Sequence, residues 1–276
     1  MASIRQRPVA LHLPIEQRKC LYCLANDEPF TKDEHVVQRA FGRAADQYKL
    51  RPGAVCDPCN FFLGRHVDSR FTRRYDISLI RGLEGWPGRG GAVKMIECHK
   101  PTVKLDITIK PDVQVAMFVN EFEKLPNGGF RVRVRPKHPE PEVALTLRAL
   151  WKIALGVMYG YLGPTFTLDP QWDPIRKAVL GAPFSGYLIQ APFHAIIDGQ
   201  LHVGIQQQTP QSPSAVTFKV GGVILGAPLV PGTSPPDDEE MRRLRSEGWT
   251  ALTTNDQPPK DLFFELEPDS TTDGAD

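Results

Sequence analysis

The chain has 276 residues, of which 41% are hydrophobic and 24% are charged. This composition is typical of a folded globular protein and argues against a disordered or fibrous chain, and the length allows one large domain or two ordinary ones. The net charge of +1 hides an asymmetry, because residues 1–75 hold 13 Lys and Arg against 8 Asp and Glu, whereas the remainder holds 20 against 24. A basic N-terminal part favours a polyanionic partner, although on charge alone a solvated basic face is the simpler explanation.

The first 17 residues show little periodicity and predict a loose N-terminal segment. The first twenty residues carry several charges and no continuous apolar run, so no secretory signal is expected and we predict a cytoplasmic protein. The most apolar helix-like stretch, residues 150–162, contains Lys152 and is shorter than the roughly 20 residues that cross a bilayer. No membrane span is therefore expected.

Two cysteine pairs follow, Cys20-x-x-Cys23 and Cys56-x-x-Cys59. In a cytoplasmic chain such pairs indicate a metal site rather than disulfides. Each spacing lets two thiolates bind one ion, and the intervening segment can form the small fold that the metal closes, so we expect one structural Zn²⁺. A redox role for either pair is the weaker alternative, because no βαβ pattern flanks it. Cys98 has no near partner and is expected to be a small, partly buried residue.

Between the pairs lies FTKDEHVVQRAFG, in which Glu34 and His35 precede two valines, and the second pair continues as CDPCNFFLG with Asn60. This combination resembles the HNH endonucleases, in particular a Cys-rich branch with CxxC, EHV and CxxCN motifs. The resemblance covers residues 18–76. It implies a zinc-stapled ββα-metal module of treble-clef-like form.

The resemblance also implies roles: His35 is the general base, while Glu34 and Asn60 bind a catalytic divalent cation, Mg²⁺ or Mn²⁺. Phosphodiester hydrolysis needs a base for water and a Lewis acid for the phosphate charge, and imidazole titrates near neutral pH. Neighbours on a strand point to opposite faces, so Glu34 and His35 can share a site only if the strand ends or bulges there.

Pro58 suits an early helical position, which places Asn60 at the start of a helix. On a straight helix Asp68 would lie about 12 Å beyond Asn60 and His66 would face away, so we expect at most supporting roles for these two unless Gly64 breaks the helix.

The commoner HNH pattern has a middle Asn where this chain has Arg51. Backbone contacts must then orient the base, or activity is reduced.

Four arginines crowd the segment beyond Asn60, and guanidinium groups suit phosphate oxygens. Each one alone is as well explained by a solvated helix end. The cluster is predicted to contact the backbone of a nucleic acid, with DNA the expected form and no base preference readable. It comprises Arg65, Arg70, Arg73 and Arg74.

Residues 100–230 predict a mixed α/β domain of unknown role, with a predominantly antiparallel sheet and one long helix. Strands are expected at 103–110, 113–122, 129–136, 185–197, 201–206 and 215–227, with a hairpin turn at Asn127-Gly128-Gly129. The helix spans 145–163 and buries Leu147, Leu150, Trp151, Ala154, Met158 and Tyr161; a shorter one is expected at 174–180. Residues 231–276 predict a Pro-rich linker, a short helix at 238–249 and an acidic, partly disordered tail.

The whole chain is thus expected to be an α+β protein. Its leading predicted function is an HNH-type endonuclease that hydrolyses phosphodiester bonds in nucleic acid. The alternative is a non-catalytic zinc-binding module that binds nucleic acid or protein. Protein partners cannot be read from the sequence.

Overall fold

The structure, a computed structural model of the chain, describes residues 18–86, 100–110, 113–126, 128, 130–135, 142–191, 199–206, 214–256 and 262–266. The predicted loose segment 1–17, Cys98 and the last residues of the acidic tail, 267–276, lie outside the described residues.

The N-terminal module consists of two very short strands and a helix. Strand β1 (Glu34–His35) pairs antiparallel with β2 (Lys49–Leu50), and the 3-10 segment η2 (Arg39–Tyr48) connects them. Helix α1 (Asp57–Leu63) follows, with Cys56 at its N-cap and Pro58 in its first turn, as the fixed φ angle of proline favours. This is the ββα order that the sequence predicts.

The helix does not stop at Gly64. It widens into a π-helical turn, η3 (Gly64–Asp68), and continues as α2 (Ser69–Phe71), before the buried helix α3 (Tyr75–Leu83). A π turn holds extra residues per turn and so changes the face on which later side chains lie. The helix is therefore neither straight nor broken, and the straight-helix placement of His66 and Asp68 does not apply.

Helix α4 (Val143–Leu162) is the central element of the fold. Its predicted apolar stripe is buried except for Tyr161, which is partly buried, and most of the remaining surface of α4 is buried too. By length and composition α4 could cross a membrane, but 89% of its most apolar stretch is buried within the protein, as in a core helix.

Three short helical segments follow α4: α5 (Pro164–Thr167), η4 (Pro170–Trp172) and α6 (Asp173–Val179). The last of them matches the predicted short helix.

A five-stranded sheet has the order β11-β7-β10-β9-β8, with every neighbouring pair antiparallel. Its strands are β7 (Tyr187–Gln190), β8 (Leu201–Gln206), β9 (Ala215–Val220), β10 (Val223–Pro228) and β11 (Thr250–Thr253). Alternating apolar residues of β9 and β10 are buried, and the antiparallel character predicted for the sheet is confirmed. The single strand predicted at 215–227 is instead the hairpin of β9 and β10, because the chain turns at residues 221–222.

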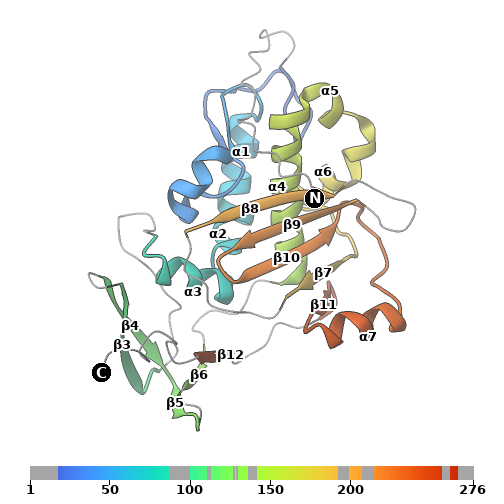
Figure 1. Cartoon of the computed structure of the whole chain (residues 1–276). Coiled ribbons are helices and arrows are strands. Elements are labelled where there is room, and N and C mark those ends of the chain that lie inside the picture. The colour runs from blue at the N-terminus through green and yellow to red at the C-terminus, as the bar shows by residue number, and fades with distance from the viewer. Residues whose placement is uncertain are drawn as a thin grey trace.

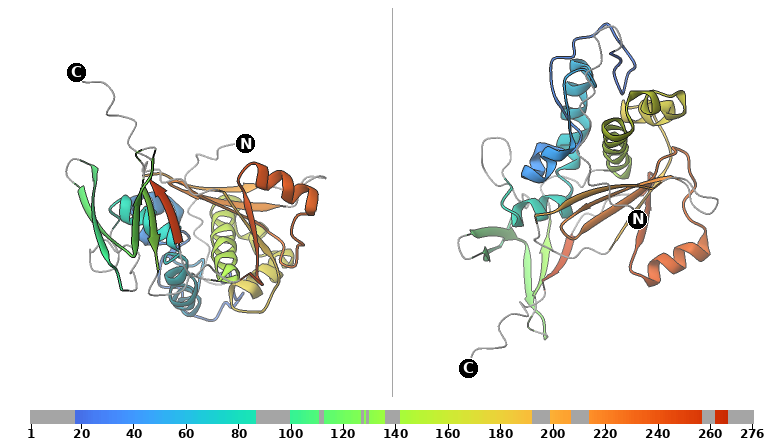
Figure 2. Two further views of the ribbon diagram at one scale, coloured as in Figure 1. Left: turned by 90° about the horizontal axis from the view of Figure 1, so that it is seen from below. Right: turned by 45° about the horizontal axis from the view of Figure 1, so that its top comes forward.

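A second group of strands stands at one side of the molecule, away from α4 (Figure 2). Strands β3 (Val103–Lys110) and β4 (Val113–Val119) pair with each other, and β5 (Glu121–Lys124) pairs with β6 (Phe130–Val134) across the predicted hairpin turn, whose residues 127 and 129 lie outside the described part.

The C-terminal region is more ordered than its sequence indicates. The predicted short helix is present as α7 (Asp238–Ser246), but the region also supplies two strands that the sequence did not predict. Strand β11 pairs with β7, and β12 (Leu262–Leu266) pairs with β6. Both partners lie far away in the sequence, so local composition carries no signal of the pairing, and the prediction of a linker and tail for this region is corrected over these residues.

One continuous hydrophobic core joins the N-terminal module, α4 and the five-stranded sheet. Phe41 and Phe71 from the module both pack edge-on against Phe218 of β9, with ring centroids 5.5 and 5.4 Å apart. Helix α4 lies beside the module helices and against one face of the sheet (Figures 1 and 2). The site of the module therefore rests on a large scaffold.

Candidate active site

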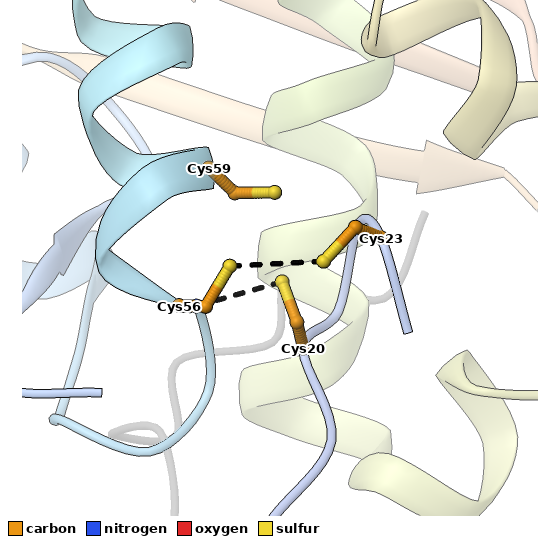
Figure 3. Close-up of side chains that lie close together, drawn as sticks. All are labelled: Cys20, Cys23, Cys56 and Cys59. Atoms are coloured by element: carbon orange, nitrogen blue, oxygen red, sulfur yellow. Dashed lines mark hydrogen bonds between the residues drawn. The ribbon is translucent and has the colours of Figure 1, made fainter. Parts of the chain in front are cut away.

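The four paired cysteines come together at one place in the module, and we call them the cysteine cluster. Cys20 and Cys23 lie on the turn before β1, whereas Cys56 and Cys59 flank the start of α1 (Figure 3). Their sulfur atoms all lie within 4.8 Å of one another, and the sulfurs of Cys23 and Cys56 are 3.7 Å apart. A tetrahedral zinc ion with Zn–S bonds of about 2.3 Å separates its sulfurs by about 3.8 Å.

The chemistry of the cysteine cluster also fits a cation. A hydrogen bond from Cys59 lowers the pKa of Cys20 to about 5, whereas burial raises the pKa of Cys56 to about 12. Several thiolates so close together repel one another unless a positive ion lies between them. The four cysteines could therefore hold a metal such as zinc, and with four thiolate ligands that metal has no open position for water.

His35 lies at the end of β1, where it pairs with Lys49 of β2, and it is half-buried. Burial lowers the pKa of its imidazole, and the charges of Arg39 and Lys49 lower it further. Its Nδ1 atom is buried and has no hydrogen-bond partner among the described residues. The lowered pKa favours the neutral imidazole, which is the state that a general base requires.

Asn60 lies in the first turns of α1 and joins this helix to the approach of β1. Its Nδ2 donates a hydrogen bond of 2.9 Å to the carbonyl oxygen of Asp33. The side-chain amide is thereby oriented, and Oδ1 is left as an acceptor that suits a hard cation. Asn60 and His35 are thus held by adjacent segments, as a shared site would need.

Glu34 has a different environment from the one that the sequence predicts. It is only 3% exposed, and its Oε1 lies 2.6 Å from the ammonium of Lys152 on α4. The strand ends directly after His35 without a bulge, so the usual alternation places these two neighbours on opposite faces. Glu34 therefore faces α4 in this structure, and its role as a cation ligand remains a prediction.

Asp68 takes part in the same contacts as Glu34. Its Oδ2 lies 3.0 Å from the Lys152 ammonium, and its Oδ1 accepts a hydrogen bond of 2.7 Å from Gln38. We call Lys152, Glu34, Asp68 and Gln38 the Lys152 cluster. The supporting role predicted for Asp68 is compatible with this position. His66, by contrast, is exposed, and its ring lies 4.8 Å from that of Phe62.

The predicted arginine cluster divides into two kinds. Arg65, Arg70 and Arg73 are exposed and remain candidates for phosphate contacts. Arg74 is only 4% exposed, because its guanidinium bonds to Asp76 and reaches Gln190 of β7. This burial argues against the predicted phosphate contact of Arg74. Nothing in the local sequence distinguishes Arg74 from its neighbours, and its contacts with Thr146 of α4 and Gln190 of β7 arise only from tertiary packing.

Sequence reasoning missed Lys152 as a residue of this site. It stands inside an apolar helical pattern and was seen only as an interruption of that pattern. A lysine at a buried helix position does carry a signal, because such a charge is stable only beside a partner. The identity of the partners, Glu34 and Asp68, is not readable from the sequence, because both lie more than eighty residues away.

Comparison with known proteins gives one match. Residues 20–76 match the family model of the HNH endonucleases. No curated protein and no solved structure matches the chain. The matched segment begins at the first cysteine and ends after Tyr75, so it contains the cysteine cluster, His35 and Asn60, whereas α4 and every sheet beyond β2 lie outside it. Residues 20–76 are therefore similar to the HNH endonucleases, and the cysteine cluster is consistent with the Cys-rich branch of that family.

Proposed function

We propose that the chain is a metal-dependent endonuclease that hydrolyses the phosphodiester bonds of DNA, with His35 as its general base. The match of residues 20–76 to the HNH endonucleases carries the proposal. The geometry supports it, since a half-buried histidine of low pKa ends β1 and an oriented asparagine on α1 lies bonded to the same segment.

His35 acts on the attacking water. A neutral ring nitrogen accepts a proton from that water while the water oxygen forms a bond to phosphorus. The bond between phosphorus and the leaving oxygen then breaks, and the leaving oxygen takes a proton from solvent. The missing middle Asn is replaced by an arrangement in which the backbone of His35 is held from α4, because the carbonyl of His35 accepts a hydrogen bond of 2.7 Å from Lys152.

Asn60 is proposed to bind the catalytic cation, Mg²⁺ or Mn²⁺, through Oδ1, since hard cations prefer oxygen ligands. When bound, such a cation supplies Lewis-acid stabilisation of the charge on the phosphate oxygens. Glu34 was predicted as a second ligand. A cation at that carboxylate would compete with an ammonium that is already 2.6 Å away.

The cysteine cluster is proposed to hold Zn²⁺ in a structural role, separate from the reaction. Exposed Arg65, Arg70 and Arg73 are proposed to contact DNA phosphates, which positions the duplex without reading its bases. The substrate could instead be RNA, and a parallel cleavage assay with RNA distinguishes the two substrates.

A non-catalytic zinc module that binds nucleic acid is the second candidate. Two observations favour it: Arg51 stands where the commoner HNH pattern has its middle Asn, and Glu34 is engaged with Lys152. Each of these two features leaves the site without a group that phosphodiester hydrolysis by HNH endonucleases ordinarily uses. The two candidate functions therefore both predict binding of nucleic acid, but only the first predicts its cleavage.

The deciding experiment measures plasmid nicking by the zinc-loaded full chain with Mg²⁺ or Mn²⁺, with single-stranded RNA as a parallel substrate. We expect His35→Ala to lower the rate by about two to four orders of magnitude, because the general base is lost. Zinc content, thermal unfolding and DNA affinity should stay near those of the wild type. His202→Ala, which removes an exposed histidine on β8, is the matched control and should cleave normally.

Wild-type cleavage by His35→Ala, in a preparation free of contaminating nuclease, would refute the proposed mechanism. DNA binding without any cleavage by the wild type would favour the zinc-binding module instead.

A further inference from the structure

The ammonium of Lys152 lies at the junction between α4 and the strand that carries His35. It is 0% exposed, and it contacts Glu34 Oε1 at 2.6 Å and Asp68 Oδ2 at 3.0 Å. It also donates a hydrogen bond of 2.7 Å to the carbonyl oxygen of His35 and a longer one of 3.4 Å to the carbonyl oxygen of Val36. Its hydrogen bonds go to Asp68 and to the two carbonyl oxygens, whereas the contact with Glu34 is an ion pair, because Glu34 Oε1 accepts no hydrogen bond among the described residues.

The same face of α4 holds the neighbouring parts of the module. Tyr22, which lies between the first two cysteines, donates its hydroxyl to the carbonyl oxygen of Lys152 at 3.2 Å. One turn further along α4, Gly156 lies so close to Val36 that a Cβ atom there would be 2.6 Å from a Val36 methyl group. Helix α4 thus contacts residues on both sides of His35.

Charge makes this contact sensitive to substitution. Two carboxylates, from Glu34 and Asp68, face one buried cation. Burial raises the pKa of Glu34, and Lys152 opposes that rise; the pKa of Lys152 is itself raised by the two carboxylates in spite of burial. A buried charge that loses its partner is strongly destabilising, whereas replacing both partners by neutral groups can be nearly neutral.

We propose that Lys152 is a positioning residue for the nuclease site, and that Glu34 anchors β1 to α4 through Lys152 rather than binding the catalytic cation. The contacts with the backbone of His35 and with the carboxylate before it fix the main chain of the general base. The expected effect of Lys152 on cleavage rests on the proposed function. The contact of Lys152 with β1 does not, because it is present in the protein without substrate.

The first experiment asks where the cation binds and uses Mn²⁺ as the probe. Free Mn²⁺ is measured by electron paramagnetic resonance in titrations of the zinc-loaded wild type, Glu34→Gln and Asn60→Ala. We expect Glu34→Gln to leave the dissociation constant for Mn²⁺ within about twofold, whereas loss of a ligand raises it by about tenfold or more. A rise in Glu34→Gln equal to that in Asn60→Ala would overturn the inference, because Glu34 would then be a ligand.

The second experiment measures the anchor directly by hydrogen exchange. The amide of Val36, which donates to the carbonyl of Tyr48 at 3.0 Å, should exchange at least about tenfold faster in Lys152→Met, because β1 is released from α4. Arg176→Met is the matched control: it removes another buried cation, on α6, which bonds to the carbonyls of Thr167 and Asp169. Equal exchange at Val36 in the two variants would overturn the inference.

The third measurement separates positioning from general stability. The double variant Glu34→Gln/Lys152→Met removes the two most deeply buried charges and leaves Asp68, whose side chain is 18% exposed and still accepts the hydrogen bond from Gln38. Its thermal stability should therefore recover in part relative to Lys152→Met. Its cleavage rate at saturating Mn²⁺ should stay about a hundredfold below that of the wild type, because a misplaced base is costly. Recovery of cleavage together with stability would show that Lys152 serves the fold alone.

The failure of the two proposals can be told apart. If the wild type does not cleave DNA, the proposed function fails, while exchange at Val36 still decides whether Lys152 anchors β1. If cleavage occurs and exchange at Val36 does not respond to Lys152→Met, the proposed function stands and the positioning role is refuted.

Discussion

The cysteine cluster and the Lys152 cluster both hold the N-terminal module, but they connect segments at very different separations along the chain. The cysteine cluster lies wholly inside residues 20–76, and each half is a pair separated by two residues. The Lys152 cluster joins β1 and η3 to a helix that begins at Val143. The first is visible in the sequence as a repeated spacing, and the second becomes visible only when α4 is packed against the module.

The comparison also separates two kinds of stability. Metal coordination by four thiolates can stabilise a small fold that has little core of its own. In the Lys152 cluster the attraction between the charges is largely offset by the cost of removing three charged groups from water, so the net stabilisation is small. We therefore expect the cysteine cluster to matter more for the existence of the module and the Lys152 cluster to matter more for the exact position of β1.

The largest effect should come from removing zinc. Chelation, or Cys56→Ser, should unfold residues around the cysteine cluster, because an apparent binding free energy of about 10 kcal/mol or more can accompany structural zinc. Elemental analysis of reduced protein should show about one zinc per chain, and circular dichroism with hydrogen exchange should show the loss of the module. Reduced protein without zinc but fully folded would contradict the prediction and leave the Lys152 cluster as the main anchor.

A smaller loss of stability is expected on substitution of Arg74, which, like Lys152, is a buried cation paired with a carboxylate. Arg74→Met should lower the free energy of unfolding by about 3 kcal/mol, because Asp76 would keep a buried charge without its partner. Its exposed neighbour offers a reciprocal control. Arg73→Met should hardly change stability, measured by denaturant unfolding.

The same pair of variants should separate again in DNA binding. Each lost phosphate contact lowers the slope of log affinity against log salt by about 0.9. Arg73→Met should show such a change and Arg74→Met should not, measured by fluorescence anisotropy at several salt concentrations. A change of slope in Arg74→Met alone would return Arg74 to the phosphate contacts and remove Arg73 from them.

The smallest effect concerns the close approach of α4 to the strand. Gly156→Ala should lower the free energy of unfolding by about 1 kcal/mol, since overpacking against Val36 costs about 1 to 3 kcal/mol and the better helix propensity of alanine returns about 1 kcal/mol. Thermal unfolding measures the difference. Val36→Ala removes a buried side chain and is destabilising by itself, so the double variant Gly156→Ala/Val36→Ala should lose less stability than the sum of the two single variants. Additive losses would mean that the approach of α4 is not what makes Gly156 necessary.

Much of the fold follows from local pattern. The apolar stripe of residues 145–163 predicts α4, because its period matches the spacing of a helix. The apolar segment 201–206 predicts β8, whereas the segment 215–227, predicted as one strand, forms the two strands β9 and β10. Strands β11 and β12 were missed, since four or five residues with no strong alternation give little signal. Their partners, β7 and β6, lie far away in the sequence.

The candidate site shows the same division. Spacing alone predicts that the four cysteines meet, and the motifs around them predict His35 and Asn60 as neighbours of one cleavage site. The sequence by itself thus determined the similarity of residues 20–76 to the HNH endonucleases, the meeting of the four cysteines, and the helical and strand periods of much of the rest. Only the tertiary structure decided that Glu34 and Asp68 face Lys152 and that Arg74 is buried. The reason is physical: chelating pairs and helix starts depend on residues a few positions apart, whereas a buried charge takes whichever partner the packing of distant elements brings to it.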